Sequence, residues 1–86
     1  MTKIKMFGVL RKFADEQGHL QIELTEGMTV SKFKTALKTT LLNKFADFDP
    51  KMIDESAVAN HSEFLGLDEI VFQQKEIAVL PPVCGG

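Results

Sequence analysis

The residues best suited to chemistry occupy the last seven positions of the chain. They are Leu80, Pro81, Pro82, Val83, Cys84, Gly85 and Gly86. The prolines lack N–H donors and fix φ, so they end sheet pairing and favour a stiff, extended segment. The glycines carry no Cβ, so the last peptide could pass through a narrow channel, and the α-carboxylate of Gly86 lies on an unhindered carbon. From composition alone, a functional tail and an ordinary frayed terminus are equally good interpretations.

The rest of the chain offers few groups for catalysis. His19 and His61 are the only histidines, and neither has a second ligand at metal-binding spacing. Gly27 and Gly66 are isolated, so the sequence holds no glycine-rich phosphate loop. We therefore expect no metal, ATP or other cofactor to be bound by this chain, and no enzyme activity from the chain on its own.

Composition indicates a small, soluble domain. The chain has 86 residues, 10 Lys+Arg against 12 Asp+Glu, a net charge of −2 and 44% hydrophobic residues. This length fits one domain, and the near-neutral charge without a basic stripe argues against nucleic acid as a partner. Cys84 is the only cysteine, which excludes an internal disulfide and fits a reducing compartment. The apolar runs are too short to cross a bilayer, so we expect a cytoplasmic protein without a membrane partner.

The elements that must position the tail can be read from the spacing of apolar residues. Residues 3–7 alternate polar and apolar side chains, as a half-buried strand does, and so do residues 20–24. Between them, residues 9–17 predict a short helix that stops near Gly18, which makes the two strands a hairpin with a helical connection. A longer helix is predicted from Val30 to about Asn43, with Thr29 as its N-cap.

The second half of the chain predicts shorter elements. Lysines 32, 34 and 38 are expected on the wet face of the long helix, and Met52 and Ile53 in an irregular segment. Residues 56–60 and 70–72 are predicted strands, and Phe72 is expected in the core. The continuous apolar run at 76–80 is typical of a strand covered on both faces. These elements predict an α+β fold in which one main helix packs on a mixed sheet, with a domain at 1–80 and a flexible, extended tail at 81–86.

The tail carries a resemblance to a known family. A strand followed by Pro81, Pro82, Val83, a small residue and the two terminal glycines resembles the small, sulfur-carrying subunit of molybdopterin synthase, the MoaD family of ubiquitin-like β-grasp proteins. Phe7, Val9 and Arg11, the helix start at Thr29, and residues 57–60 also occur in the expected order. Two departures from the family are Gln74-Lys75 in place of the usual Gly-Asp turn, and Cys84 in place of Ser or Thr. Cys84 is most simply a size substitute, and sulfur exchange or a mixed disulfide with a partner is the minor alternative.

The resemblance implies a mechanism in which other proteins supply the catalytic groups. A ubiquitin-activating-like enzyme would adenylate Gly86 with ATP and Mg²⁺, and sulfur from a donor persulfide would replace AMP to leave a thiocarboxylate. The large subunit of molybdopterin synthase would then admit the tail, residues 81–85 included, and pass the sulfur from Gly86 to the pterin precursor. Two small subunits and a large-subunit dimer would form a heterotetramer. Leu80 and Arg11 are candidate docking residues, with burial under the protein's own loops and simple solvation as their respective alternatives.

Three other functions stay open. A β-grasp sulfur carrier of the thiamine pathway, or of another thio-metabolite, also ends in Gly-Gly, but such thiamine carriers are typically shorter and lack Pro-Pro-Val. A ubiquitin-like protein modifier would join Gly86 to lysines of other proteins. A plain binding module would not need Gly86 at all.

Overall fold

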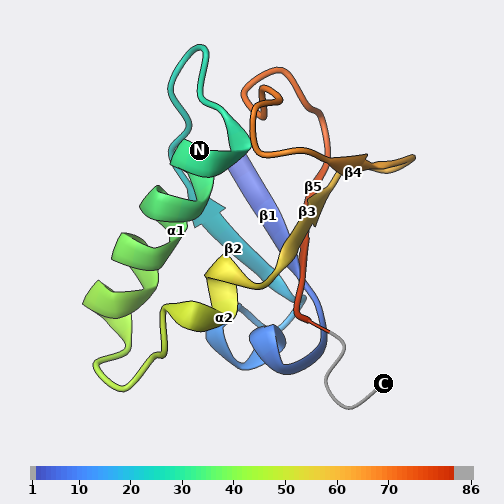
Figure 1. Cartoon of the computed structure of the whole chain (residues 1–86). Helices are drawn as coiled ribbons and strands as arrows, with labels where there is room; N and C mark the ends of the chain where they lie inside the picture. The colour runs from blue at the N-terminus through green and yellow to red at the C-terminus, as the bar shows by residue number, and fades with distance from the viewer. Residues whose placement is uncertain (1, 83–86) are drawn as a thin grey trace.

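Residues 2–82, the part that this computed structural model describes, form a five-stranded mixed sheet with one long helix on one face (Figure 1). The strands are β1 (Thr2–Met6), β2 (His19–Ile22), β3 (Ala57–Ala59), β4 (Phe64–Leu65) and β5 (Ile77–Leu80). The helices are the 3-10 helix η1 (Gly8–Phe13), the long α1 (Val30–Lys44) and the short α2 (Lys51–Asp54). The predicted α+β class, with one main helix packed on a mixed sheet, is confirmed, and so is the antiparallel pairing of the first two strands around a helical connection.

The strand that leads to the C-terminal residues lies in the middle of the sheet, because the strand order is β2-β1-β5-β3-β4. β5 pairs parallel with β1, where Ile4 is opposite Ile77, and antiparallel with β3, where Val58 is opposite Val79. The N–H of Phe7 continues the contact beyond β1 by donating to the carbonyl of Val79 at 3.2 Å. β5 is therefore held along both edges up to its last residues.

The long helix supplies much of the core. Thr29 caps it as predicted, since its Oγ1 accepts the N–H of Lys32 at 3.3 Å. Its buried side chains are Val30, Phe33, Leu37 and Leu41. They belong to one apolar cluster with the inward-facing residues of the sheet, among them Ile4, Met6, Ile77 and Val79. Within residues 2–82, no helix is both long and apolar enough to cross a bilayer.

The last strand is covered on one face only, so the expectation of a strand buried on both faces is wrong. Ile77 and Val79 are buried, but Ala78 and Leu80 are only half-buried. Successive side chains of a strand point to opposite faces, so Ala78 and Leu80 lie on the face away from the core. The run is continuously apolar because the outer face of this central strand carries Ala78 and Leu80. No second layer of the described structure covers that face.

The first helical segment is shorter than predicted. It is a 3-10 helix that ends at Phe13, and the chain then turns through residues 15–18 instead of continuing as a helix to Gln17. The carboxylate of Asp15 accepts the N–H groups of Gln17 and His19, both at 2.9 Å. Such side-chain bonds to nearby N–H groups compete with helix formation, which explains the early end.

The segment that holds Met52 and Ile53 is helical, so the prediction of an irregular segment is wrong. Ile53 is fully buried and Met52 is half-buried, but both lie on α2, which follows Pro50. Proline fits the first turn of a helix because its missing N–H is not needed there. The Ser56 hydroxyl donates to the carbonyl of Met52 just beyond the helix.

The predicted strand at 70–72 is not a strand. Ile70 forms a single isolated bridge with Thr29, and Val71 is buried. Phe72 is 43% exposed, so its expected place in the core is also wrong. The hairpin partner of β3 is instead the two-residue β4, in which Phe64 is opposite Ala59.

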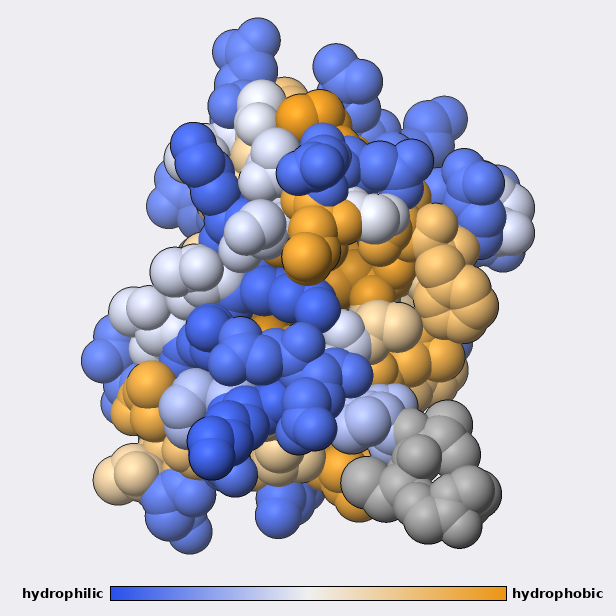
Figure 2. Space-filling view, in the orientation of Figure 1, coloured by the Kyte–Doolittle hydropathy of each residue, from blue (hydrophilic) through white to orange (hydrophobic). Residues whose placement is uncertain are grey.

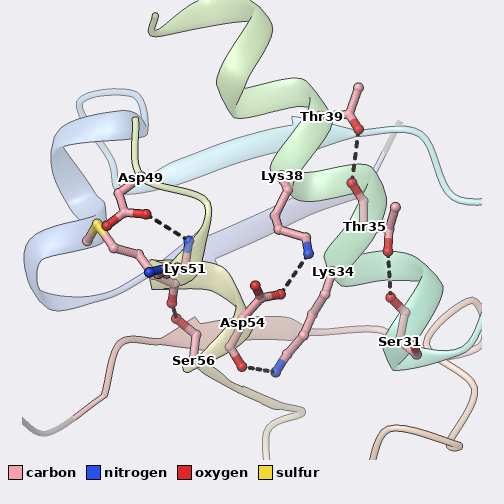
Figure 3. A network of polar contacts seen from close by, with 10 residues as sticks. Ser31, Lys34, Thr35, Lys38, Thr39, Asp49, Lys51, Asp54 and Ser56 are labelled. Atoms are coloured by element: carbon pink, nitrogen blue, oxygen red, sulfur yellow. Dashed lines mark hydrogen bonds and ion pairs between the residues drawn. The ribbon is translucent and has the colours of Figure 1, made fainter. Parts of the chain in front are cut away.

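Two lysines of α1 pack against α2 rather than standing free in water (Figure 3). Lys38 Nζ lies 2.7 Å from Asp54 Oδ1, and Lys34 Nζ donates to the backbone carbonyl of Asp54 at 3.3 Å. Burial lowers the pKa of Lys34, the negative charge of Asp54 opposes that shift, and the positive charge of Lys38 adds to it. The long aliphatic stems of these lysines let them cover the neighbouring helix while the charge finds a partner.

Candidate functional site

The described chain ends at the root of the predicted tail. β5 ends at Leu80, and Pro81 and Pro82 after it are both half-buried. The predicted carrier residue Gly86 lies outside the described residues, and so do Val83, Cys84 and Gly85. The described part of the candidate site consists of the end of β5, the two prolines after it and the surface beside them.

The surface beside this root is the outer face of the sheet, where a groove of about 680 Å³ crosses several strands. The pairing registers place one row of side chains across it, in which Lys5 is opposite both His19 and Ala78, and Ala59 is opposite Phe64. Figure 2 shows apolar side chains gathered over β3, β4 and β5, on the right of the view. The apolar side chains that line the groove from this face are Phe7, Ala59, Phe64, Ala78 and Leu80.

The groove also carries charge. Lysines 3, 5 and 75 line it together with Glu63 and Glu76. Lys5 Nζ lies 5.2 Å from the centre of the Phe7 ring, within the range of a cation–π contact. An apolar floor with a mixed, mostly basic rim is typical of a protein-docking surface rather than of a small-molecule pocket, where polar groups converge on one point.

The two predicted docking residues fall in different places. Leu80 is half-buried and lines the groove, next to the root of the tail. Arg11 is exposed on η1 and does not line the groove. The guanidinium of Arg11 instead lies close to Gly18, in the turn before β2.

Sequence reasoning missed Phe64, the most exposed large apolar side chain among the described residues at 69%. It lies on β4, and a two-residue strand leaves no alternating pattern to detect. Phe7, just beyond the end of β1, is half-buried and also lines the groove. An aromatic residue flanked by Glu63 and beyond the end of a predicted strand is the weak signal that could have pointed to this surface.

The two histidines lie at the same groove, but the described residues around them do not form a metal site. His19 and His61 both line the groove, and the Nδ1 atom of His19 is buried without a hydrogen-bond partner. Among residues 2–82, no group of three or more His, Cys, Asp or Glu side chains is arranged to hold a metal ion.

Comparison with known proteins agrees with this architecture. No curated protein is detectably similar to the chain. Among solved structures, the chain is similar to SAMP1 from Haloferax volcanii, with a TM-score of 0.64 and 25% sequence identity over 99% of this chain and 98% of that one. The sequence pattern of the ThiS family matches residues 4–86, which includes the predicted tail. The chain therefore belongs to the ThiS family and has its ubiquitin-like sulfur-carrier fold.

Proposed function

We propose that this protein is the sulfur-carrying small subunit of molybdopterin synthase. The observation that carries the proposal is the Pro-Pro-Val-Cys-Gly-Gly sequence at residues 81–86, directly after the central strand β5. Membership of the ThiS family supports a sulfur carrier. The Pro-Pro-Val part of the ending favours the molybdopterin pathway over the thiamine pathway.

The chemistry begins with activation, because a carboxylate is a poor electrophile. The Gly86 carboxylate attacks the α-phosphate of ATP in an activating enzyme, with Mg²⁺ present, and pyrophosphate leaves. A persulfide from a sulfur donor then displaces AMP and forms an acyl disulfide at Gly86. A second thiol attacks the donor's sulfur, which releases the Gly86 thiocarboxylate and leaves a disulfide on the donor side.

The large synthase subunit uses the loaded tail in the second half of the cycle. The thiocarboxylate enters its active site and transfers sulfur to the pterin precursor, while acids and bases of the large subunit move the protons. Proline fixes φ at Pro81 and Pro82, so less conformational freedom is lost each time the tail is ordered in a partner. The heterotetramer of two small and two large subunits is the proposed assembly.

The groove on the outer sheet face is the proposed docking surface for both partners. Its apolar floor includes Leu80, so a partner seated there lies beside the origin of the tail. Arg11 is the weaker docking candidate, because it is exposed on η1 away from the groove lining.

The thiamine-type carrier is the second candidate, and the family match is the observation that favours it. A protein modifier is the third candidate, since an activated Gly86 could also acylate lysines of other proteins. The two sulfur-carrier pathways share the thiocarboxylate and differ in the enzyme that consumes it, whereas the modifier forms isopeptide-linked adducts of higher mass.

Intact mass spectrometry tests the carrier function directly. After incubation with an activating enzyme, ATP and a sulfur source, the chain should gain the mass of one oxygen exchanged for sulfur, and the change should map to Gly86. The Cys84→Ser variant must show the same gain, because oxidation of Cys84 adds nearly the same mass. Deletion of Gly86 should abolish the gain, while Gly66→Ala should not, because a Cβ on Gly66 would meet the Glu69 carboxylate only at 4.0 Å, an ordinary contact distance.

Complementation distinguishes the pathways. In a cell that lacks its own small subunit, the chain should restore molybdenum-enzyme activity, and the Gly86 deletion should restore none. Restoration of thiamine-independent growth in a thiamine-carrier mutant, without restoration of molybdenum-enzyme activity, would move the assignment to the second candidate. Molybdenum-enzyme activity that survives the deletion would refute the proposal.

A further inference from the structure

Gly8 and Pro81 meet where β1 gives way to η1 and β5 gives way to the tail. Figure 1 shows the start of η1 beside the end of β5. Gly8 has a φ of +57°, a conformation that side chains disfavour. A Cβ placed on Gly8 would lie 2.8 Å from Pro81 Cγ and 3.5 Å from Pro81 Cδ. The Pro81 ring therefore packs directly over the backbone of Gly8.

The structure around this contact could not easily make room for a side chain at position 8. The ring of Pro81 is closed onto its own backbone, so its Cγ can shift only by a change of ring pucker and cannot rotate away as the end of a flexible side chain would. The backbone before it is also held, because Leu80 is paired with Ala57 of β3. On the other side, the N–H of Phe7 is bonded to the carbonyl of Val79. A side chain at position 8 would have to displace Pro81 itself.

We propose that Gly8 is a positioning residue for the C-terminal segment. It lets the Pro81 ring lie against the domain, and so fixes the point and the direction from which the last residues leave. This inference rests on the proposed function, in which Gly86 must reach the active sites of two partners. In this proposal Gly8 acts through its contact with Pro81 rather than on the reacting carboxylate.

Chain length explains why this placement matters. In the proposed function the reacting carboxylate belongs to Gly86, so residues 83–86 separate it from Pro82, and four fully extended residues span at most about 14 Å. A partner seated on the domain must therefore present its active site within that distance of Pro82. So short a segment cannot correct for a displaced origin, and a misplacement of about 1 Å at a reacting group can lower a rate by up to about 100-fold.

The test compares two glycines with the same backbone constraint but different surroundings. Gly8→Ala introduces the Cβ that meets Pro81. Gly27→Ala is the matched control, because Gly27 also has a positive φ, +76°, but has nothing within 4 Å of its Cβ position. The measurement is the steady-state rate of Gly86 adenylation by an activating enzyme with ATP, together with urea unfolding. We expect Gly8→Ala to lower kcat/KM by about tenfold or more, and Gly27→Ala to leave it close to that of the unmodified chain.

A double-mutant cycle isolates the contact. Pro81→Ala removes both ring atoms that the new Cβ would meet, so Gly8→Ala should lower kcat/KM clearly less in the Pro81→Ala background. Gly8→Asn is the second variant, since asparagine tolerates a positive φ and so folds more readily while it still carries a Cβ. The proposal is overturned if Gly8→Ala has the same effect in both backgrounds, or if Gly27→Ala lowers kcat/KM as much.

Failure of the proposed function gives a different result. If the unmodified chain, with Gly86 intact, is not adenylated at all, the carrier function fails. The Gly8–Pro81 contact is then tested by the same double-mutant cycle, with the free energy of unfolding in urea as the measured quantity, because this measurement needs no partner. Additive effects of the Gly8 and Pro81 substitutions on the free energy of unfolding would overturn it, and a clear coupling would support it.

Discussion

A single carboxylate determines how the chain turns from η1 into β2. Asp15 accepts the N–H groups of His19 and Gln17, while its own N–H donates to the carbonyl of His19 at 2.8 Å. The hydrogen bond from His19 is the main reason that the pKa of Asp15 lies below 3.8, and it outweighs partial desolvation, which acts in the opposite direction. The same bonds occupy the outer edge of β2 at His19, where an unpaired strand edge could otherwise recruit another chain.

The depressed pKa of Asp15 predicts a specific pH dependence of stability. The ionised carboxylate stabilises the fold above pH 3.8, and this contribution is lost as the pH falls through the lower folded-state pKa. We expect Asp15→Ala to be less stable than the unmodified chain near neutral pH, and the difference to shrink below pH 3.8. Urea unfolding followed by circular dichroism measures this, since the chain has no Trp or Tyr for fluorescence. A difference that stays constant down to low pH, or that Glu16→Ala reproduces, would contradict this explanation.

At the scale of elements, α2 shows which contacts hold a short helix in place. The Lys38–Asp54 pair links it to α1, but the two side chains are 26% and 55% exposed, so water weakens their attraction. Ile53 points into the core and is fully buried. Burial of this one side chain therefore contributes more to the docking of α2 than the visible ion pair does.

Paired substitutions separate the two contributions to α2. Ile53→Ala should lower the free energy of unfolding by about 2–5 kcal/mol, because it removes buried apolar surface and leaves a cavity. Lys38→Met, which keeps an aliphatic stem over α2, should lower it by less than about 1 kcal/mol. Chemical denaturation of both variants checks this order. An equal or larger loss for Lys38→Met would show that the ion pair dominates.

The elements that the sequence predicts correctly are those with local signals. Thr29 caps α1 through its own side chain, and Phe33 and Leu37 repeat at helical spacing, so neighbours in sequence carry the information. The errors occur where tertiary contacts decide. The early end of η1 depends on a turn closed between Asp15 and His19, and β4 exists only because β3 pairs with it.

The candidate site could be predicted only in part for the same reason. The tail ending at Gly86 is a contiguous motif and is visible in the sequence alone. The groove is not, since Lys5, Ala78, Ala59 and Phe64 become neighbours only through the pairing of four strands. The contact between Pro81 and Gly8 joins residues far apart in the chain, so it leaves no local pattern in the sequence.

At the scale of the whole molecule, the two faces of the sheet differ. One face carries α1 and the core, and the other carries the groove beside the tail root. Substitutions in the groove should therefore affect partner binding with little effect on stability. The most exposed groove residue, Phe64, gives the clearest case.

Phe64→Ala should raise the KM for the activating enzyme while kcat stays nearly unchanged, because docking is weakened but the tail is intact. An aromatic anchor that a partner buries contributes about 2 kcal/mol or more, which corresponds to a KM increase of about 30-fold. Leu42→Ala is the matched control, since Leu42 is 42% exposed on α1 and does not line the groove. Equal KM values for Phe64→Ala and the unmodified chain would exclude the groove as the docking surface.

The central place of β5 also governs when the domain can fold during its synthesis. β1 is synthesised before β5, its parallel partner. Ile4 can therefore pair with Ile77 only after β5 has been made, and the middle of the sheet forms only then. Pairings between distant parts of a chain form late, because loop closure must come before the contacts that stabilise it. A chain that stops before residue 77 lacks Ile77 and Val79, so we expect part of the buried face of α1 to stay uncovered. Folding is thus tied to synthesis of the strand that carries the tail, and under the proposed function we expect a truncated chain without that strand not to compete for the activating enzyme.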